Sequence, residues 1–252
     1  MLVGDQLPAH VAALYAGDAT GAFAPGGVYW WAAGDYEMAP RTRAAGDELD
    51  EAVTEDLRPN GLEPRTRVCL HEGPDCLVEG VLVDPATGEP AQTFVQSFQL
   101  DADGAIRRAI SLRCQAVEPS ASWAEPDDAF PHSARAALDR YFGDLDASRF
   151  EEAAASFSMD TLYSHPPYFP GAPRSEFRGR DELNAGFAMR GPRKNFHELT
   201  VVLQRGREGI IEGYSHRPDG GSAQFVSSLS LDDEGLIRRY VVVVFEPAAG
   251  RI

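Results

Sequence analysis

Apolar and polar residues alternate along two long stretches of the chain, and the two stretches resemble each other. Residues 91–117 and 223–245 each read as a strand, an acidic turn, the tripeptide Ile-Arg-Arg and a second strand. Alternation with a period of two is typical of strands that bury one face. Upstream, the tripeptide Asp-Glu-Leu that begins at residue 47 recurs at residue 181. Because the order is the same in both halves, the chain contains one domain twice.

The second copy begins with helices and ends with strands. Apolar residues at three- and four-residue spacing after Ser133, a suitable N-cap, predict its first helix. The other predicted elements are helices at 150–157 and 182–189, a short strand at 161–165, and strands at 197–205, 209–217, 223–231 and 237–246. The first copy shares this back half, but its front helix is shorter, at about residues 8–15. This order indicates an α+β fold.

The composition sets limits on the class of protein. A net charge of −16 over 252 residues argues against nucleic-acid and anionic membrane partners, which select for basic patches. The three cysteines lie in the first copy without a CxxC pair, which predicts reduced thiols and a cytoplasmic protein. We place the two domains at 1–118 and 132–252, joined by a linker at 119–131 that is rich in Pro, Ser and Asp.

Several segments of the second copy carry a family resemblance. They are Leu138-Asp-Arg-Tyr-Phe-Gly-Asp-Leu-Asp, Phe157-Ser-Met-Asp-Thr-Leu-Tyr-Ser-His-Pro166, Phe177-Arg-Gly-Arg-Asp-Glu-Leu183 and Asp232-Asp-Glu-Gly-Leu-Ile237. Each copy resembles a nuclear transport factor 2-like (NTF2-like) domain of the SnoaL-like polyketide cyclase and ketosteroid isomerase type. The resemblance implies a cone-shaped domain, in which a curved antiparallel sheet wraps around helices and leaves a pocket at its open end. Relatives often dimerise through sheet faces, so the fused pair implies an intramolecular pseudo-dimer and leaves further self-association open.

The same resemblance implies a set of pocket residues. Tyr141 matches the oxyanion-binding tyrosine of isomerase-type members, and His165 falls where those members hold a catalytic aspartate. Ketosteroid isomerase adds a second, protonated aspartate, and Ser227 at that position argues against steroid isomerisation. Strand alternation turns Tyr163 inward together with His165. Matching of the later strands adds the remaining inward residues: Glu212, Tyr214, His216, Phe225 and Tyr240.

The first copy serves as an internal control for these assignments. Alignment pairs Tyr163 with Tyr29 but His165 with Trp31, and it pairs Tyr214 and His216 with valines. We therefore expect one working pocket, in the second domain, and a filled structural interior in the first. Glu212 recurs as Glu79 in the copy without these histidines, so pairing with an arginine is an alternative to a catalytic role. The recurring arginines of Ile-Arg-Arg are expected to pair with the acidic turns.

The predicted chemistry is acid/base catalysis without a cofactor or metal. His165 titrates near neutral pH and suits a general base, with Glu212 to orient its ring and Tyr141 or Tyr163 to stabilise an oxyanion. A cyclase, isomerase or dehydratase acting on a small hydrophobic carbonyl compound, in secondary metabolism, is the leading hypothesis. Tyr214, His216, Phe225, Ser227 and Tyr240 would contact the substrate. The alternatives are a non-catalytic ligand-binding or assembly protein, and a functional surface between the copies at Trp30, Trp31 and Tyr36.

Overall fold

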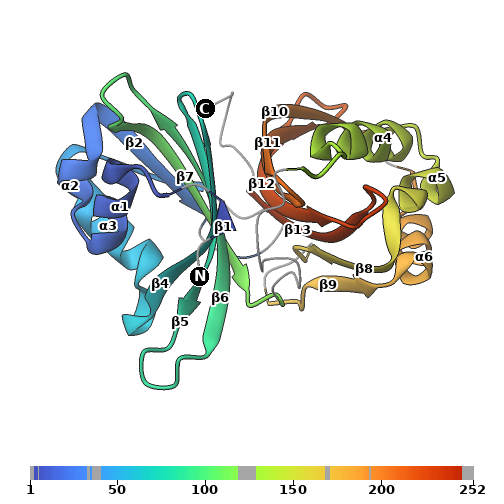
Figure 1. Cartoon of the computed structure of the whole chain (residues 1–252), viewed down its shortest axis with the longest axis horizontal. Helices are drawn as coiled ribbons and strands as arrows, with labels where there is room; N and C mark the ends of the chain where they lie inside the picture. The colour runs from blue at the N-terminus through green and yellow to red at the C-terminus, as the bar shows by residue number, and fades with distance from the viewer. Residues whose placement is uncertain are drawn as a thin grey trace.

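Two sheets, each with helices on one face, make up the protein. The computed structural model describes residues 3–4, 6–32, 35, 41–118, 129–167, 171–192 and 194–245. Tyr36 and most of the predicted linker lie outside these residues. The predicted α+β fold with two domains is confirmed, and we call the parts that carry the first and second sheets the first and second domain (Figure 1). No helix in the described part of the chain is long and apolar enough to cross a membrane.

Among the residues that the structure describes, the first domain has seven strands and three α-helices. Its elements are β1 (Val3–Gly4), α1 (Ala9–Ala16), α2 (Ala19–Ala22), β2 (Phe23–Ala32), β3 (Arg41–Ala45), α3 (Leu49–Leu57), β4 (Glu63–Glu72), β5 (Asp75–Val83), β6 (Pro90–Leu100) and β7 (Ile106–Gln115), with short 3-10 turns at Gly46–Glu48 and Pro59–Gly61. The described part of the second domain has six strands and three α-helices. Its elements are α4 (Ala134–Asp146), α5 (Phe150–Ala155), β8 (Phe157–His165), β9 (Ser175–Arg178), α6 (Arg180–Arg190), β10 (Phe196–Arg205), β11 (Glu208–His216), β12 (Ser222–Leu231) and β13 (Ile237–Phe245).

The strand orders of the two sheets show the duplication directly. The first sheet runs β1-β4-β5-β6-β7-β2-β3 and the second runs β10-β11-β12-β13-β8-β9. Apart from the added β1, each strand has a counterpart at the same place, including the parallel pairs β2–β7 and β8–β13. As predicted, Ser133 caps α4, its Oγ accepting a hydrogen bond from the Ala136 backbone N–H at 3.3 Å. The predicted helix at 150–157 ends earlier, because Phe157 already begins β8.

The acidic turns are closed by their own first aspartate rather than by arginine. The Asp101 carboxylate accepts hydrogen bonds from the backbone N–H groups of Asp103 and Ala105, each at 2.9 Å. Asp232 does the same in the second copy, at 2.8–2.9 Å. A glycine with positive φ follows in both turns, with φ 82° at Gly104 and 75° at Gly235. The turns thus fix the hairpins and leave the neighbouring arginines for other partners.

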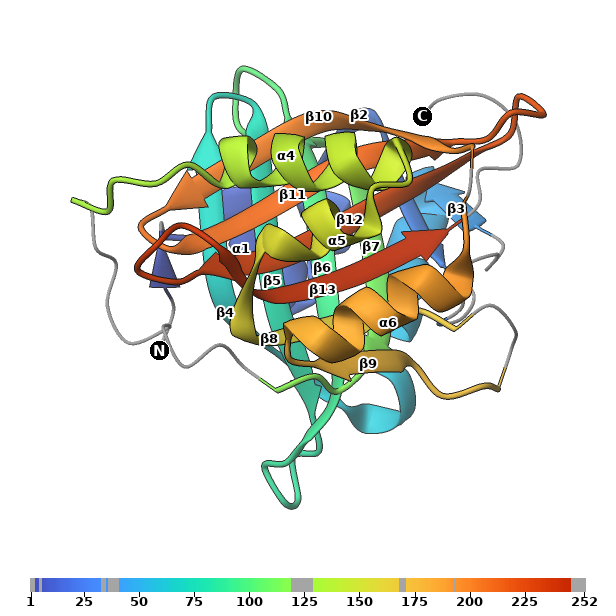
Figure 2. The ribbon, with the colours of Figure 1, turned by 90° about the vertical axis from the view of Figure 1, so that its right-hand side faces the viewer.

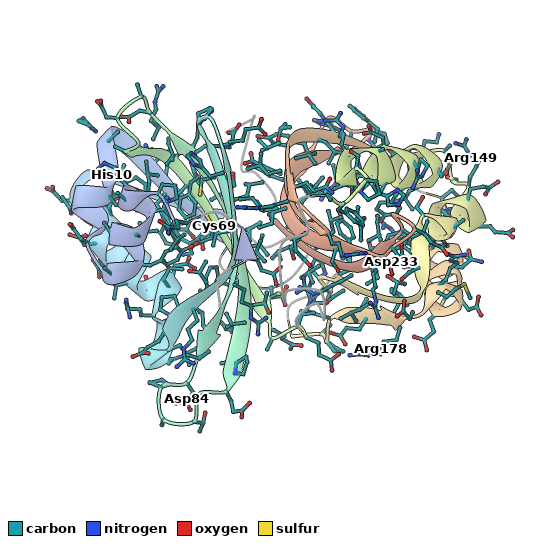
Figure 3. The ribbon with its side chains drawn as sticks, viewed as in Figure 1. His10, Cys69, Asp84, Arg149, Arg178 and Asp233 are labelled. Carbon is teal, nitrogen blue, oxygen red and sulfur yellow. The ribbon has the colours of Figure 1, made fainter. Side chains whose placement is uncertain are left out.

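The two sheets pack against each other through their outer faces, and the helices cover the far sides (Figure 1). Seen along the other axis, the strands of the two sheets cross steeply, with α4, α5 and α6 in front (Figure 2). Aliphatic side chains fill the space between the sheets (Figure 3). The buried apolar residues at this interface include Val68, Leu70, Leu77, Val95, Ile110 and Leu112 of the first sheet and Leu203, Ile210, Val226, Val241 and Val243 of the second. This arrangement is the expected intramolecular pseudo-dimer.

Two ion pairs cross this apolar interface in a reciprocal pattern. Glu79 of the first domain pairs with Arg239 of the second, at 2.7 and 3.0 Å. Glu212 of the second domain pairs with Arg108 of the first, at 2.9 and 3.0 Å. Both are bidentate, the geometry in which a guanidinium and a carboxylate interact most strongly. The second arginine of each Ile-Arg-Arg therefore pairs with the glutamate of the other copy, which corrects the expected pairing with the acidic turns.

A third charged contact joins the domains at the edge of the interface. The buried Arg174 donates to Asp35 at 2.6 Å, and also to the backbone oxygens of Ser164 and Val242 at 3.2 and 2.5 Å. Burial raises the pKa of Asp35, although the neighbouring Arg174 acts in the opposite direction. Arg174 thus ties β8 and β13 of the second domain to the segment that follows β2 of the first.

Two adjacent arginines allow a matched test of the interface. Arg239→Gln leaves Glu79 buried without its charged partner, so we expect the free energy of unfolding to fall by about 3–5 kcal/mol. Arg238→Gln removes only an exposed pair with Asp160 and should cost less than about 1 kcal/mol. Urea denaturation followed by circular dichroism measures both. Equal losses in the two variants would contradict a central role for the reciprocal pairs.

Candidate functional site

A cavity of about 40 Å³ lies between α4 and the inner face of the second sheet, and the empty space reaches about 530 Å³ when the open solvent at its mouth is included. We call it the main cavity. Its apolar and aromatic lining comes from α4 and from β8, β12 and β13, while polar side chains come from the ends of α6, β10 and β11. The described lining residues are Tyr141, Phe142, Leu145, Tyr163, His165, Arg190, Asn195, His197, Ser215, Arg217, Ala223, Phe225, Tyr240, Val242 and Val244. Apolar walls with a few polar groups are typical of small-molecule sites.

The structure brings five of the predicted site residues to this cavity: Tyr141, Tyr163, His165, Phe225 and Tyr240. The hydroxyl oxygens of Tyr141 and Tyr163 lie 3.2 Å apart, within hydrogen-bond distance. Ser227 is fully buried and lies on the same face of β12 as Phe225, next to the Tyr240 hydroxyl. These residues lie on β8, β12 and β13 and on the buried face of α4. The inward faces of the strands follow from the alternation of apolar and polar residues, and the buried face of α4 follows from the helical spacing of its apolar residues.

His165 ends β8 with its ring parallel to that of Tyr163, at an interplanar angle of 3° and a centroid distance of 6.1 Å. Its Nδ1 lies 2.8 Å from the backbone oxygen of Pro166. A carbonyl oxygen only accepts hydrogen bonds, so Nδ1 carries the proton and Nε2 holds the lone pair in the neutral ring. The ring is therefore fixed in the tautomer that a general base at Nε2 requires.

A second histidine in the main cavity was not predicted. His197 is the second residue of β10, and its Nδ1 lies 2.6 Å from Asp146 Oδ1 at the end of α4. The other carboxylate oxygen of Asp146 accepts a hydrogen bond from the His197 backbone N–H at 2.8 Å. Phe142 stacks on the imidazole, with centroids 4.5 Å apart. This carboxylate–histidine pair holds the ring rigidly and places the lone pair on Nε2.

The sequence did not single out His197, which is only the first residue of the strand predicted at 197–205. The two partners are 51 residues apart, and no local spacing connects them. Only the packing of α4 across the end of β10 brings the carboxylate to the imidazole. An acidic residue at the end of an amphipathic helix, followed by a histidine at the start of a long strand, was the one available signal.

Glu212, Tyr214 and His216 lie on the opposite face of β11 from the cavity, which corrects the predicted orientation of this strand. In the pairing of β11 with β12, Gly213 lies opposite Phe225, and Glu212 lies opposite Val226. Paired residues share a face, and a shift of one residue exchanges the two faces of a strand. The cavity therefore receives Ser215 from β11, while the predicted glutamate faces the first domain.

The recurring Glu-Gly dipeptide contained the signal for this orientation. A side chain at Gly213 would come within 2.6 Å of the Phe225 ring, and one at Gly80 would come within 2.3 Å of Phe94. Glycine thus makes room for an inward phenylalanine in both copies, and the preceding glutamate must point outward. Glu212 accepts hydrogen bonds from Ser97 and Gln224 in addition to Arg108. It orients no histidine.

His216 forms a carboxylate–histidine pair of its own, outside the main cavity. Its Nε2 lies 2.9 Å from Glu198 Oε2, and its ring stacks on Phe196 and Tyr214, with centroids 4.6 and 5.9 Å away. Phe196 is among the few large apolar side chains that are exposed. This cluster at the ends of β10 and β11 resembles the Asp146–His197 pair chemically but does not line the cavity.

A second, more apolar cavity adjoins the first. It encloses about 700 Å³ including open space, and its walls include Phe177, Phe187 and Met189. Tyr163, His165 and Arg190 line both cavities. Among the residues that the structure describes, no group of three or more His, Cys, Asp or Glu side chains is placed to hold a metal ion.

Burial keeps the tyrosine hydroxyls of the main cavity protonated. Burial raises the pKa of Tyr141 well above its ordinary value, and the neighbouring Tyr163 and Tyr240 add to the shift. Burial likewise raises the pKa of Tyr240. Both groups are therefore neutral hydrogen-bond donors at physiological pH, in a place where a developing negative charge would be little screened by water.

This shift has a consequence for alkaline stability. Because the pKa of Tyr141 is higher in the folded than in the unfolded chain, its contribution is complete below about pH 10 and is lost as the pH rises further. Tyr141→Phe should therefore reduce the steepness with which stability falls between pH 10 and 12. Urea midpoints measured from pH 8 to 12 test this, and parallel curves for parent and variant would contradict it.

Comparison with known proteins gives matches in structure and none in sequence. No protein-family model matches the sequence, and no curated protein matches it. A protein from Kribbella flavida, provisionally described as a ketosteroid isomerase, is 24% identical over 47% of this chain and 80% of its own, with a TM-score of 0.36. An NTF2-like protein of unknown function from Burkholderia xenovorans is 19% identical over 46% and 86%, with a TM-score of 0.38. The epoxide hydrolase/cyclase-like enzyme SalBIII is 15% identical over 45% and 90%, with a TM-score of 0.35. Each match covers about half of the chain.

Proposed function

We propose that the protein is a cofactor-independent enzyme that moves a proton on a small hydrophobic carbonyl compound bound in the main cavity. The observation that carries the proposal is the Asp146–His197 pair, held at 2.6 Å with its imidazole on the cavity wall. Cyclisation, isomerisation and dehydration all begin with such a proton transfer, and all three remain within the proposal.

The histidines supply the base. In the proposed step, Nε2 of His197 removes a proton from the carbon next to the substrate carbonyl, and the electron pair moves onto the carbonyl oxygen. Asp146 accepts a hydrogen bond from Nδ1 and stabilises the imidazolium that forms. The protonated His197 then returns the proton at a second carbon, and His165, whose Nδ1 is held by Pro166, faces the same cavity with a second basic Nε2.

The tyrosines supply the acid. The hydrogen-bonded hydroxyls of Tyr141 and Tyr163, together with Tyr240, would donate to the enolate oxygen. Donors of this kind are fixed before the reaction begins, so they stabilise the charge of the transition state without reorganising. Phe225 and Val242 would contact the apolar body of the substrate. Glu212, Tyr214 and His216 take no part in this proposal.

Proton exchange provides a test that needs no knowledge of the true substrate. The chain is incubated in D2O with 2-tetralone, whose C1 protons are acidic, and the loss of the proton signal is followed by NMR. We expect exchange faster than in buffer, and a reduction of about 10²–10⁴-fold in His197→Gln, the usual contribution of a general base. Asp146→Asn should lose activity to a lesser degree.

His216→Gln is the matched control, because it removes the same side chain from a carboxylate–histidine pair outside the cavity. It should exchange at the parent rate. If His197→Gln exchanges as fast as the parent, His197 is not the base. If the parent accelerates no ketone of this kind while the probe binds the cavity, the protein is a ligand-binding module rather than an acid/base enzyme.

A further inference from the structure

The main cavity holds the proposed chemistry but offers little room. It measures about 40 Å³, whereas the second cavity measures about 270 Å³. One buried water needs about 10–15 Å³, and an apolar cavity of about 150 Å³ binds a benzene ring. The main cavity therefore suits a carbonyl group with its neighbouring carbons, and the second cavity has room for at least one ring.

The second cavity lies between α6 and the strands β8 and β9, against which α6 packs (Figure 2). Phe187 of α6 and Phe177 of β9 form apolar walls. Gly186, in the middle of α6, makes room for Phe177, because a Cβ at this position would come within 2.4 Å of the phenylalanine ring. An aromatic side chain thus lies directly against the helix backbone and lines the cavity.

Met189 extends this apolar wall to the surface of the protein. It lines the second cavity but not the main cavity, and it is 83% exposed. Large apolar side chains are seldom left in water without a reason when they adjoin an apolar hollow. The unbranched side chain of methionine adapts to ligands of different shape, and a ligand in this cavity would remove part of it from water.

The first domain uses the corresponding positions to fill its interior. Tyr29 and Trp31 correspond to Tyr163 and His165, each pair 134 residues apart like the recurring Asp-Glu-Leu. The Tyr29 hydroxyl donates to the buried carboxylate of Asp56 at 2.5 Å. The Trp31 ring lies 5.8 Å from the Tyr29 ring and packs against the core of the first domain.

The second domain does not repeat this packing. Arg113 pairs with Asp56 at 2.8 Å, which completes a chain of tyrosine, carboxylate and guanidinium in the first domain. The counterparts of Asp56 and Arg113 are Arg190 and Val244, with offsets of 134 and 131 residues. A smaller imidazole, that of His165, takes the place of the indole, and it lines both cavities.

We propose that the second cavity binds the apolar end of an elongated substrate whose carbonyl group lies in the main cavity. The substrate would pass Tyr163 and His165, which line both cavities. The inference rests on the proposed function for the position of the carbonyl group. It names the substrate class as a hydrophobic ketone that extends, beyond the carbons next to the carbonyl, by at least one ring or by an alkyl chain of similar volume.

Calorimetric titration with two ketones that differ only at the end remote from the carbonyl tests the inference. 2-Tetralone and 6-phenyl-2-tetralone share the ketone, and the second compound carries an added phenyl ring. We expect the parent chain to bind 6-phenyl-2-tetralone at least about tenfold more tightly, because burial of the ring removes apolar surface from water. Equal binding of the two ketones, or no binding of the larger one, would overturn the proposal.

Two variants change the second cavity and leave the lining of the main cavity intact. Ser175→Phe fills the second cavity from β9 and should remove the preference for the larger ketone. Met189→Ala shortens the exposed wall, so it should weaken 6-phenyl-2-tetralone by about 3–10-fold and 2-tetralone by less than about twofold. Met159→Ala is the matched control, because Met159 is also exposed and lines neither cavity, and it should bind both ketones as the parent does.

The outcomes separate this inference from the proposed function. Circular dichroism establishes that each variant is folded. An unchanged preference in Ser175→Phe would overturn the inference, and Met189→Ala decides in the same way if Ser175→Phe does not fold. Proton exchange of 2-tetralone is measured independently, so its absence in a chain that still prefers the larger ketone would overturn only the acid/base chemistry.

Discussion

The exchange of glutamate and arginine between the two sheets is the constraint on which the rest of the structure depends. Each copy contributes Glu79 or Glu212 and Arg108 or Arg239 to the outer face of its sheet, and each pair is completed only across the interface. A buried charge without its partner costs several kcal/mol. If the two sheets packed in a different alignment, these charges would therefore be buried without their partners. The apolar residues around the pairs supply the attraction, and the pairs select the alignment.

This constraint explains which repeated residues stayed the same and which diverged. The residues of the shared interface had to remain complementary, so both copies keep Glu-Gly and Ile-Arg-Arg. The interiors face away from the partner and were free to change separately. In the first domain, Trp31 and the Tyr29–Asp56–Arg113 chain occupy the positions that hold His165, Tyr163, Arg190 and Val244 in the second.

The sequence predicted the fold well because the repeat, the alternation and the acidic turns are local signals that both copies confirm. The family resemblance placed Tyr141 and His165 at the cavity, and strand alternation placed Tyr163 on the same face as His165. The predicted inward orientation of Glu212, Tyr214 and His216 was wrong. A shift of one residue in the register of β11 exchanges its two faces, and only the pairing of Gly213 with Phe225 shows which face lines the cavity. The sequence also failed for His197, because the contact with Asp146 arises from tertiary packing over 51 residues of chain.

The covalent joining of the two copies has a consequence for the balance between stability and activity. An open cavity lowers stability, because the groups around it lack packing partners. In a dimer of identical subunits, every substitution that opens one cavity also opens the other. Here the two interiors can change independently, so the cost of the main cavity falls on the second domain alone.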